Sequence, residues 1–286
     1  MQKHCNAEGI AWYIWSVLRT FRDVIVPLLF VAGAYVAGVE STTVLFIIVG
    51  YAHFLLGYIY RLRSRREPYV HLFLTPIVVL SLFALYFVYI GHVVPIFILT
   101  AIIFATHFSY DEFFLKGEQV SRWRALTLAS FLGIDFFLSV GLVVPAYSQY
   151  LFASALALLV LMGVRILVGK ENVSGAEKYL AFVGALLFLL AGLGSADIML
   201  GAIVLLHCYN WYDWGHARAV EKKAVFPYWR DVGLTLSVFV AVFVLVRAEL
   251  VPSLASLFSL NEYFYYYYPL AVAHIATSVR FGMLRG

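Results

Sequence analysis

The chain consists of ten apolar stretches separated by short segments that are rich in glycine, proline and charged residues. Most stretches have the length of about 20 residues that an α-helix needs to cross a bilayer. No cleavable signal peptide is expected, because the N-terminus is polar and no short apolar run precedes a small-residue cleavage site. The pattern predicts an all-α, polytopic integral membrane protein, a single domain over residues 1–286, with about ten transmembrane helices. The stretches cover residues 23–39, 43–60, 69–90, 95–113, 125–145, 149–168, 178–194, 197–214, 232–250 and 263–282.

The basic residues indicate the orientation of these helices. With ten spans the loops alternate between two sides, and nearly all lysines and arginines fall on one side. These residues gather around 61–66, 116–124, 170–178 and 218–230, and on the opposite side only Arg247 comes close. Loops rich in Lys and Arg stay in the cytoplasm. We therefore expect a multi-pass protein of the cell membrane with both termini in the cytoplasm.

Composition excludes other classes of protein. Of the 286 residues, 63% are hydrophobic and 13% are charged, and the mean hydropathy is +0.90. Soluble domains carry about 25% charged residues. The net charge of +4 gives no basic patch for nucleic acid, because the basic residues lie at helix ends. Cys5 and Cys208 are the only cysteines, and no disulfide is expected between a polar terminus and an apolar run.

Tyrosines form a dense run at the outer end of the last stretch, over Tyr263–Tyr268. One interpretation is an aromatic belt at the lipid headgroups, where amphipathic rings are common. The other is that some of these rings line a passage for an apolar substrate.

Four of the eight histidines lie inside apolar stretches that all run from the outer to the inner side. His53, His107, His207 and His274 are followed by the next Lys or Arg after 8, 9, 11 and 6 residues. At 1.5 Å per helical residue, the four side chains fall within about 8 Å of one another in depth. Ionisable residues inside a membrane face the bundle interior and mark functional sites. His4, His71, His92 and His216 lie at the ends of stretches or in loops.

Four neutral imidazoles at one depth indicate a metal site, because imidazole binds Fe, Cu, Zn and Ni. The spacing alone does not select iron over copper or zinc. A haem-binding electron carrier is an alternative, although two haems would need histidine pairs at two depths. A proton-relaying transporter is another, but the broken helices of such proteins are not found in repeated halves of this chain.

Few acidic residues lie near this depth. Ligating histidines usually donate their second N–H to a carboxylate or a carbonyl group. Asp135 lies in the middle of its stretch, where an unpaired carboxylate is costly, so it is the strongest candidate to orient a ligand. For Asp111, Glu112 and Asp213 the alternative is solvation at the membrane interface, and for Asp135 it is a structural bond to a neighbouring helix.

The surroundings of the four histidines resemble the membrane β-carotene 15,15′-dioxygenases, the family of bacteriorhodopsin-related proteins. Tyr-Ala-His53-Phe-Leu-Leu-Gly is similar to that family's first motif, and His107-Phe-Ser-Tyr-Asp-Glu112-Phe is similar to its His-Phe-x-x-x-Asp-Phe. Leu-Leu-His207-Cys-Tyr-Asn-Trp and Ala-Val-Ala-His274-Ile resemble the later motifs. The family often has a second histidine where this chain has Trp211, so either His274 completes the site or the metal is held differently.

The resemblance implies an Fe(2+) enzyme that cleaves β-carotene, or a related carotenoid, with O2 to give retinal. Iron would be held by the four histidines, with Glu112 and Asp135 orienting them. The carotenoid would enter from the lipid bilayer, and a rhodopsin that receives the retinal is a candidate partner. The alternative within the same chemistry is another membrane iron oxygenase that acts on an isoprenoid or a lipid.

Overall fold

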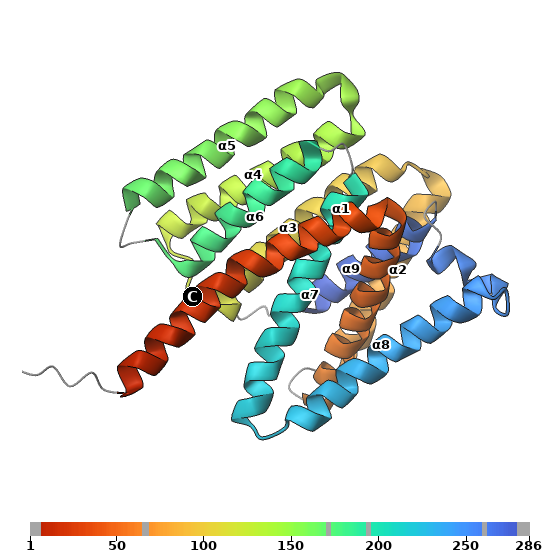
Figure 1. Ribbon diagram of the computed structural model, residues 1–286. Helices are drawn as coiled ribbons and strands as arrows, with labels where there is room; N and C mark the ends of the chain where they lie inside the picture. The colour runs from red at the N-terminus through yellow and green to blue at the C-terminus, as the bar shows by residue number, and fades with distance from the viewer. Residues whose placement is uncertain (1–6, 65–68, 170–172, 193–195, 259–261, 279–286) are drawn as a thin grey trace, which may run out of the picture.

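The protein is a bundle of long α-helices. The computed structural model describes residues 7–278 apart from 65–68, 170–172, 193–195 and 259–261 (Figure 1). The described residues form α-helices and short 3₁₀ turns, with no β-strand among them. An α-helix satisfies its backbone polar groups within the segment, which a lipid environment requires. The predicted all-α class is confirmed for this part of the chain.

The helices overlap all ten predicted stretches, and the first two stretches lie within one helix. In chain order the elements are α1 (Ala7–Ser64), α2 (Tyr69–Tyr89), α3 (Val93–Leu115), α4 (Arg122–Val143), η1 (Pro145–Tyr147), α5 (Ser148–Gly169), α6 (Gly175–Gly192), α7 (Ala196–Glu221), α8 (Val225–Arg247), η3 (Pro252–Leu257) and α9 (Tyr263–Ser278).

A sharp turn divides α1 into two helical segments. Gly38 has φ 79° and ψ 172°, in the positive-φ region that residues with a Cβ atom rarely adopt. The hydroxyl of Thr42 donates a hydrogen bond to the carbonyl of Ala34 at 3.1 Å. In a straight helix these residues would be about 12 Å apart along the axis, so the chain reverses at Gly38. The reversal falls at the predicted boundary between the first two stretches.

Seven helices among the described residues are long and apolar enough to cross a membrane: the segments within α1 (counted once, as Asp23–Arg63), α2, α3, α4, α5, α6 and α8. Two others differ from this group. The 16 residues of α9 are short for a span, and α7 carries polar residues along its last turns. The outward face of α5 supports a lipid environment, because five of its aliphatic side chains are 50% to 76% exposed: Val160, Leu161, Val164, Leu167 and Val168. The fold is that of a multi-pass membrane protein.

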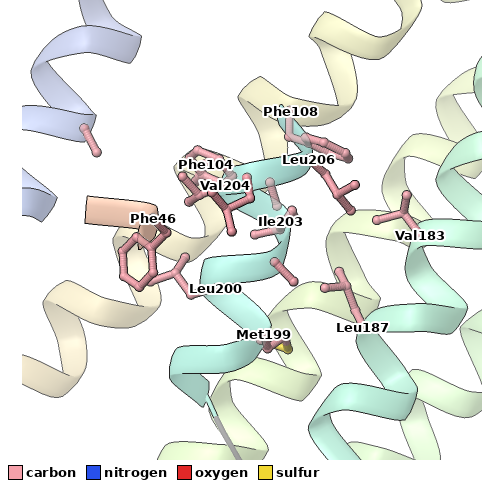
Figure 2. Close-up of a cluster of buried hydrophobic side chains, with 14 of the residues drawn as sticks. Phe46, Phe104, Phe108, Val183, Leu187, Met199, Leu200, Ile203, Val204 and Leu206 are labelled. Atoms are coloured by element: carbon pink, nitrogen blue, oxygen red, sulfur yellow. The ribbon is translucent and has the colours of Figure 1, made fainter. Parts of the chain in front are cut away.

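The first half of α7 lies at the centre of the bundle. Its residues from Ile198 to Cys208 are buried on every side, as expected for a helix that is apolar all round. Figure 2 shows its side chains between Phe46 of α1, Phe104 of α3 and Leu187 of α6. Because His207 lies near the end of this buried segment, the central helix holds it in the interior.

Candidate metal centre

The four intramembrane histidines come together from four different helices. His53 lies on α1, His107 on α3, His207 on α7 and His274 on α9. The ring centre of His207 is 5.3 Å from that of His53 and 5.0 Å from that of His107. The ring centre of His274 is 5.0 Å from that of His53 and 6.0 Å from that of His107. The shared depth expected from the sequence is therefore accompanied by lateral convergence.

This histidine cluster is shielded from the surroundings and leaves ring nitrogen atoms without hydrogen-bond partners. His53 is 7% exposed and His207 is 2% exposed. Among the described residues, neither ring nitrogen of His207 has a hydrogen-bond partner, and the same holds for Nε2 of His107. Buried polar atoms are nearly always satisfied in folded proteins, and exceptions point to a water molecule or an ion. The nitrogen lone pairs thus suit a metal ion.

Aromatic side chains hold the rings in place. Phe54 stacks on His274 with 4.9 Å between the ring centres. Phe104 approaches His207 edge-on at 5.5 Å, and Phe108 lies 6.0 Å from the same ring. These aromatic rings pack against the imidazoles and constrain their orientation.

Asp111 is a carboxylate in direct reach of the cluster, and the sequence analysis did not select it as a site residue. Its Oδ2 lies 3.3 Å from Nε2 of His107 and 3.9 Å from Nε2 of His207. Trp211 donates its indole N–H to the same oxygen at 2.6 Å. One ligand atom from each of His107, Asp111 and His207 lies within 4.8 Å of the others. The spacing contained the signal, because residues i and i+4 share a helix face, and both His107–Asp111 and His207–Trp211 have it.

Glu112 is buried beside the cluster and bonds to another residue of α7. It is 2% exposed, and its Oε1 accepts a hydrogen bond from Nδ2 of Asn210 at 2.6 Å. Asn210 also donates to the hydroxyl of Tyr179 on α6 at 2.9 Å. Glu112 therefore joins α3 to α7 three residues beyond His207, and its hydrogen bond goes to Asn210, not to a ligand ring.

Asp135 is buried in α4, a helix that carries none of the four histidines. It is 4% exposed, and its Oδ2 has no hydrogen-bond partner among the described residues. Among the described residues, Asp135 makes no hydrogen bond to a histidine. The prediction that Asp135 orients a ligand histidine is therefore not supported by a direct hydrogen bond.

The remaining histidines stay away from the cluster. His71 and His92 are exposed, on α2 and before α3. Nδ1 of His216 accepts a hydrogen bond from the indole of Trp229 at 3.0 Å. His4 lies outside the described residues.

The tyrosine run at the start of α9 divides between two environments. Tyr267 and Tyr268 are 2% and 3% exposed, whereas Tyr265 and Tyr266 are 39% and 42% exposed. The buried Tyr267 ring lies 5.5 Å from Phe54, which itself stacks on His274. Part of the run therefore faces the interior and reaches toward the histidine cluster.

Comparisons with protein-family models, with curated protein sequences and with solved structures found no match. The function is therefore inferred from the residues of this chain and from their arrangement.

Proposed function

We propose that the protein is a membrane-embedded, non-haem iron dioxygenase. The observation that carries this proposal is the convergence of four histidines from four helices, with both ring nitrogens of His207 lacking a hydrogen-bond partner. A structural role would be expected to pair these atoms with neighbouring donors and acceptors. A metal ion would accept the lone pair of one nitrogen of each ring and so offset the cost of burying it.

The donor set fits iron. Imidazole nitrogens suit iron, copper, zinc and nickel, and the combination of histidines with a carboxylate is frequent among oxygen-activating iron enzymes. His53, His107, His207 and His274 would hold the ion. Bound iron would supply the binding and activation of O2. The protein constrains the orientation of the rings through Phe54, Phe104 and Phe108.

A carotenoid is the proposed substrate, cleaved to retinal. The four histidine motifs resemble those of the carotene-cleaving family, and a long apolar polyene would reach the cluster from the bilayer. An apolar groove of about 280 Å³ lies between α2 and α9, lined by Leu80, Phe83, Ala84, Phe87, Tyr265, Tyr266, Pro269 and Leu270. His274 lies on α9 five residues beyond Pro269, so this lipid-accessible groove runs alongside the helix that carries a ligand.

We further propose ten membrane crossings in the cell membrane, with cytoplasmic termini. In Figure 1, α3, α5 and α7 end, and α4, α6 and α8 begin, toward the same end of the bundle. These helix ends flank the loops that are rich in Lys and Arg. Counting α1 as two crossings and including α7 and α9 gives the ten segments.

The test begins with the full-length protein purified in detergent. Metal analysis should find about one iron per chain, and the visible absorption should lack the Soret band of haem. Incubation with β-carotene and air should then produce retinal. His71 is exposed and lies away from the cluster. The His71→Ala variant should therefore keep both its bound iron and its ability to form retinal. Retinal formation without bound metal, or a Soret band, would contradict the proposal. If the protein oxidised another isoprenoid but not β-carotene, the proposed substrate would be wrong.

A further inference from the structure

We propose that Asp111 is an oxygen ligand of the same metal ion and that Trp211 positions its carboxylate. This inference rests on the proposed metal site and does not depend on carotenoid cleavage. It concerns one pair of side chains, joined by the 2.6 Å hydrogen bond from Nε1 of Trp211 to Oδ2 of Asp111.

The direction of approach supports a ligand role for Asp111. A carboxylate that orients a histidine from behind contacts the ring nitrogen opposite the metal. Oδ2 of Asp111 instead faces Nε2 of two rings from two helices, at 3.3 Å from His107 and 3.9 Å from His207. Both Nε2 atoms have no hydrogen-bond partner among the described residues. Three atoms thus face one another across a small space.

The separations fit a shared ion. Ligand atoms that bind one metal at about 2 Å lie about 3 to 4 Å from one another. The two N–O distances fall within this range. Two histidines and one carboxylate on a common face form the ligand set of many non-haem iron oxygenases. His53 and His274 are not among the three residues whose ligand atoms lie within 4.8 Å of one another. The ring centre of His53 lies 5.3 Å from that of His207, and the ring centre of His274 lies 6.0 Å from that of His107.

Trp211 determines where this oxygen points. The indole N–H is a donor only and cannot itself bind a metal. Trp211 lies on α7 one turn beyond His207, and its ring stacks on Phe114 of α3 with 6.1 Å between the ring centres. The hydrogen bond therefore ties the carboxylate of α3 to the helix that carries His207. It leaves Oδ2 further lone pairs for a metal ion.

Cobalt(II) binding tests this assignment without any catalytic assay. The metal-depleted full-length protein in detergent is titrated with Co²⁺, and both the affinity and the visible ligand-field spectrum are recorded. Asp111→Asn should change the spectrum and weaken binding by more than 100-fold, whereas Asp111→Glu, which keeps a carboxylate, should restore part of the affinity. Trp211→Phe should weaken binding by about 10–100-fold, the usual effect of losing an outer partner.

A double-mutant comparison separates positioning from packing. If Trp211 acts through Asp111, Trp211→Phe should have little further effect in the Asp111→Asn background. Trp214→Phe is the matched control, because Trp214 lies one turn further on α7 and contacts Trp211 at 5.2 Å between ring centres. Gel filtration confirms that each variant is folded.

Three results would overturn the proposal. Asp111→Asn with an unchanged cobalt spectrum and affinity would remove Asp111 from the ligand set. An equal effect of Trp211→Phe in both backgrounds would show that Trp211 only packs. Failure of the wild-type protein to bind Co²⁺ would overturn the metal site itself. Cobalt binding without carotenoid cleavage would leave the Asp111 assignment intact and reject the dioxygenase activity alone.

Discussion

Gly57 of α1 lies directly against the imidazole of His274 on α9. A Cβ atom added to Gly57 would lie 3.0 Å from Cε1 of His274 and 3.6 Å from its Nδ1. A side chain at Gly57 would therefore require the His274 ring to shift by a few tenths of an ångström. Within one turn, α1 thus carries His53 and, at Gly57, the space in which the ring of His274 lies.

Gly57→Ala should displace His274 and weaken metal binding by about tenfold. Alanine is by itself favourable in a helix, by about 0.5–1 kcal/mol relative to glycine, so a loss cannot be attributed to helix propensity. Gly33→Ala in the same helix is the control, since a Cβ there meets nothing within 4 Å. Metal titration and thermal unfolding of both variants measure the effect. Equal affinities in the two variants would show that His274 adjusts freely or is no ligand.

The proposed ligand set predicts that the histidines fall into two groups, those needed for metal binding and those that are not. Replacing any one of His53, His107, His207 or His274 by Ala should lower bound iron and abolish turnover, because each ring converges on the same cluster. Metal content of the purified variants and retinal formation are the measurements.

His71→Ala and His92→Ala provide the controls for this series, because both side chains are exposed away from the cluster. These variants should keep metal and activity. If His274→Ala also kept both while the other three lost them, four-histidine ligation would be refuted.

The helices could be predicted from the sequence because the bilayer imposes a length on each apolar stretch. The same argument placed the four histidines at one depth. Lateral position is a different matter, because it depends on which face each helix presents to its neighbours. The turn at Gly38 illustrates this limit: the boundary between two stretches is visible in the apolar pattern, but the contact of Thr42 with Ala34 that closes the turn is not.

The acidic residues show what the sequence leaves open. The depth of Asp135 predicts a role in orienting a ligand, and this stays a prediction, since its Oδ2 has no hydrogen-bond partner among the described residues. For Asp111 the sequence leaves solvation at the membrane interface open, whereas in the structure its carboxylate faces two of the rings. The position of a residue along a helix gives its depth in the membrane, but not the direction in which its side chain faces. The i, i+4 spacing from His107 was the more informative signal.

Glu112 should contribute to stability more than to ligation. Glu112→Leu removes the acceptor of the Asn210 amide and leaves a buried donor unsatisfied on that side, which should cost about 1–3 kcal/mol. Glu112→Gln retains a carbonyl oxygen and should recover most of this loss. Thermal unfolding of the two variants, with metal titration in parallel, tests the assignment. A loss of metal binding in Glu112→Gln without destabilisation would instead place Glu112 at the metal.

The topology predicts which loops accept a membrane-impermeant thiol reagent. After replacement of Cys5 and Cys208, a cysteine at Ser64 should remain unlabelled from outside intact cells, because the loop that follows α1 is rich in arginine. A cysteine at Ala146, between α4 and α5, should be labelled. Labelling at Ser64 from outside would reject the cytoplasmic assignment of that loop.

Asp135→Asn should leave metal affinity within about threefold of wild type. The Asp135 carboxyl group is buried with Oδ2 unbonded among the described residues, and an amide is less costly than a carboxylate to bury without a partner. The variant should therefore be as stable as wild type or more stable. Metal titration and thermal unfolding, with Asp111→Asn measured alongside as the variant expected to lose the ion, check both expectations. If Asp135→Asn weakened binding by about 10–100-fold, the usual effect of losing an outer partner, Asp135 would act on the metal through a neighbouring group.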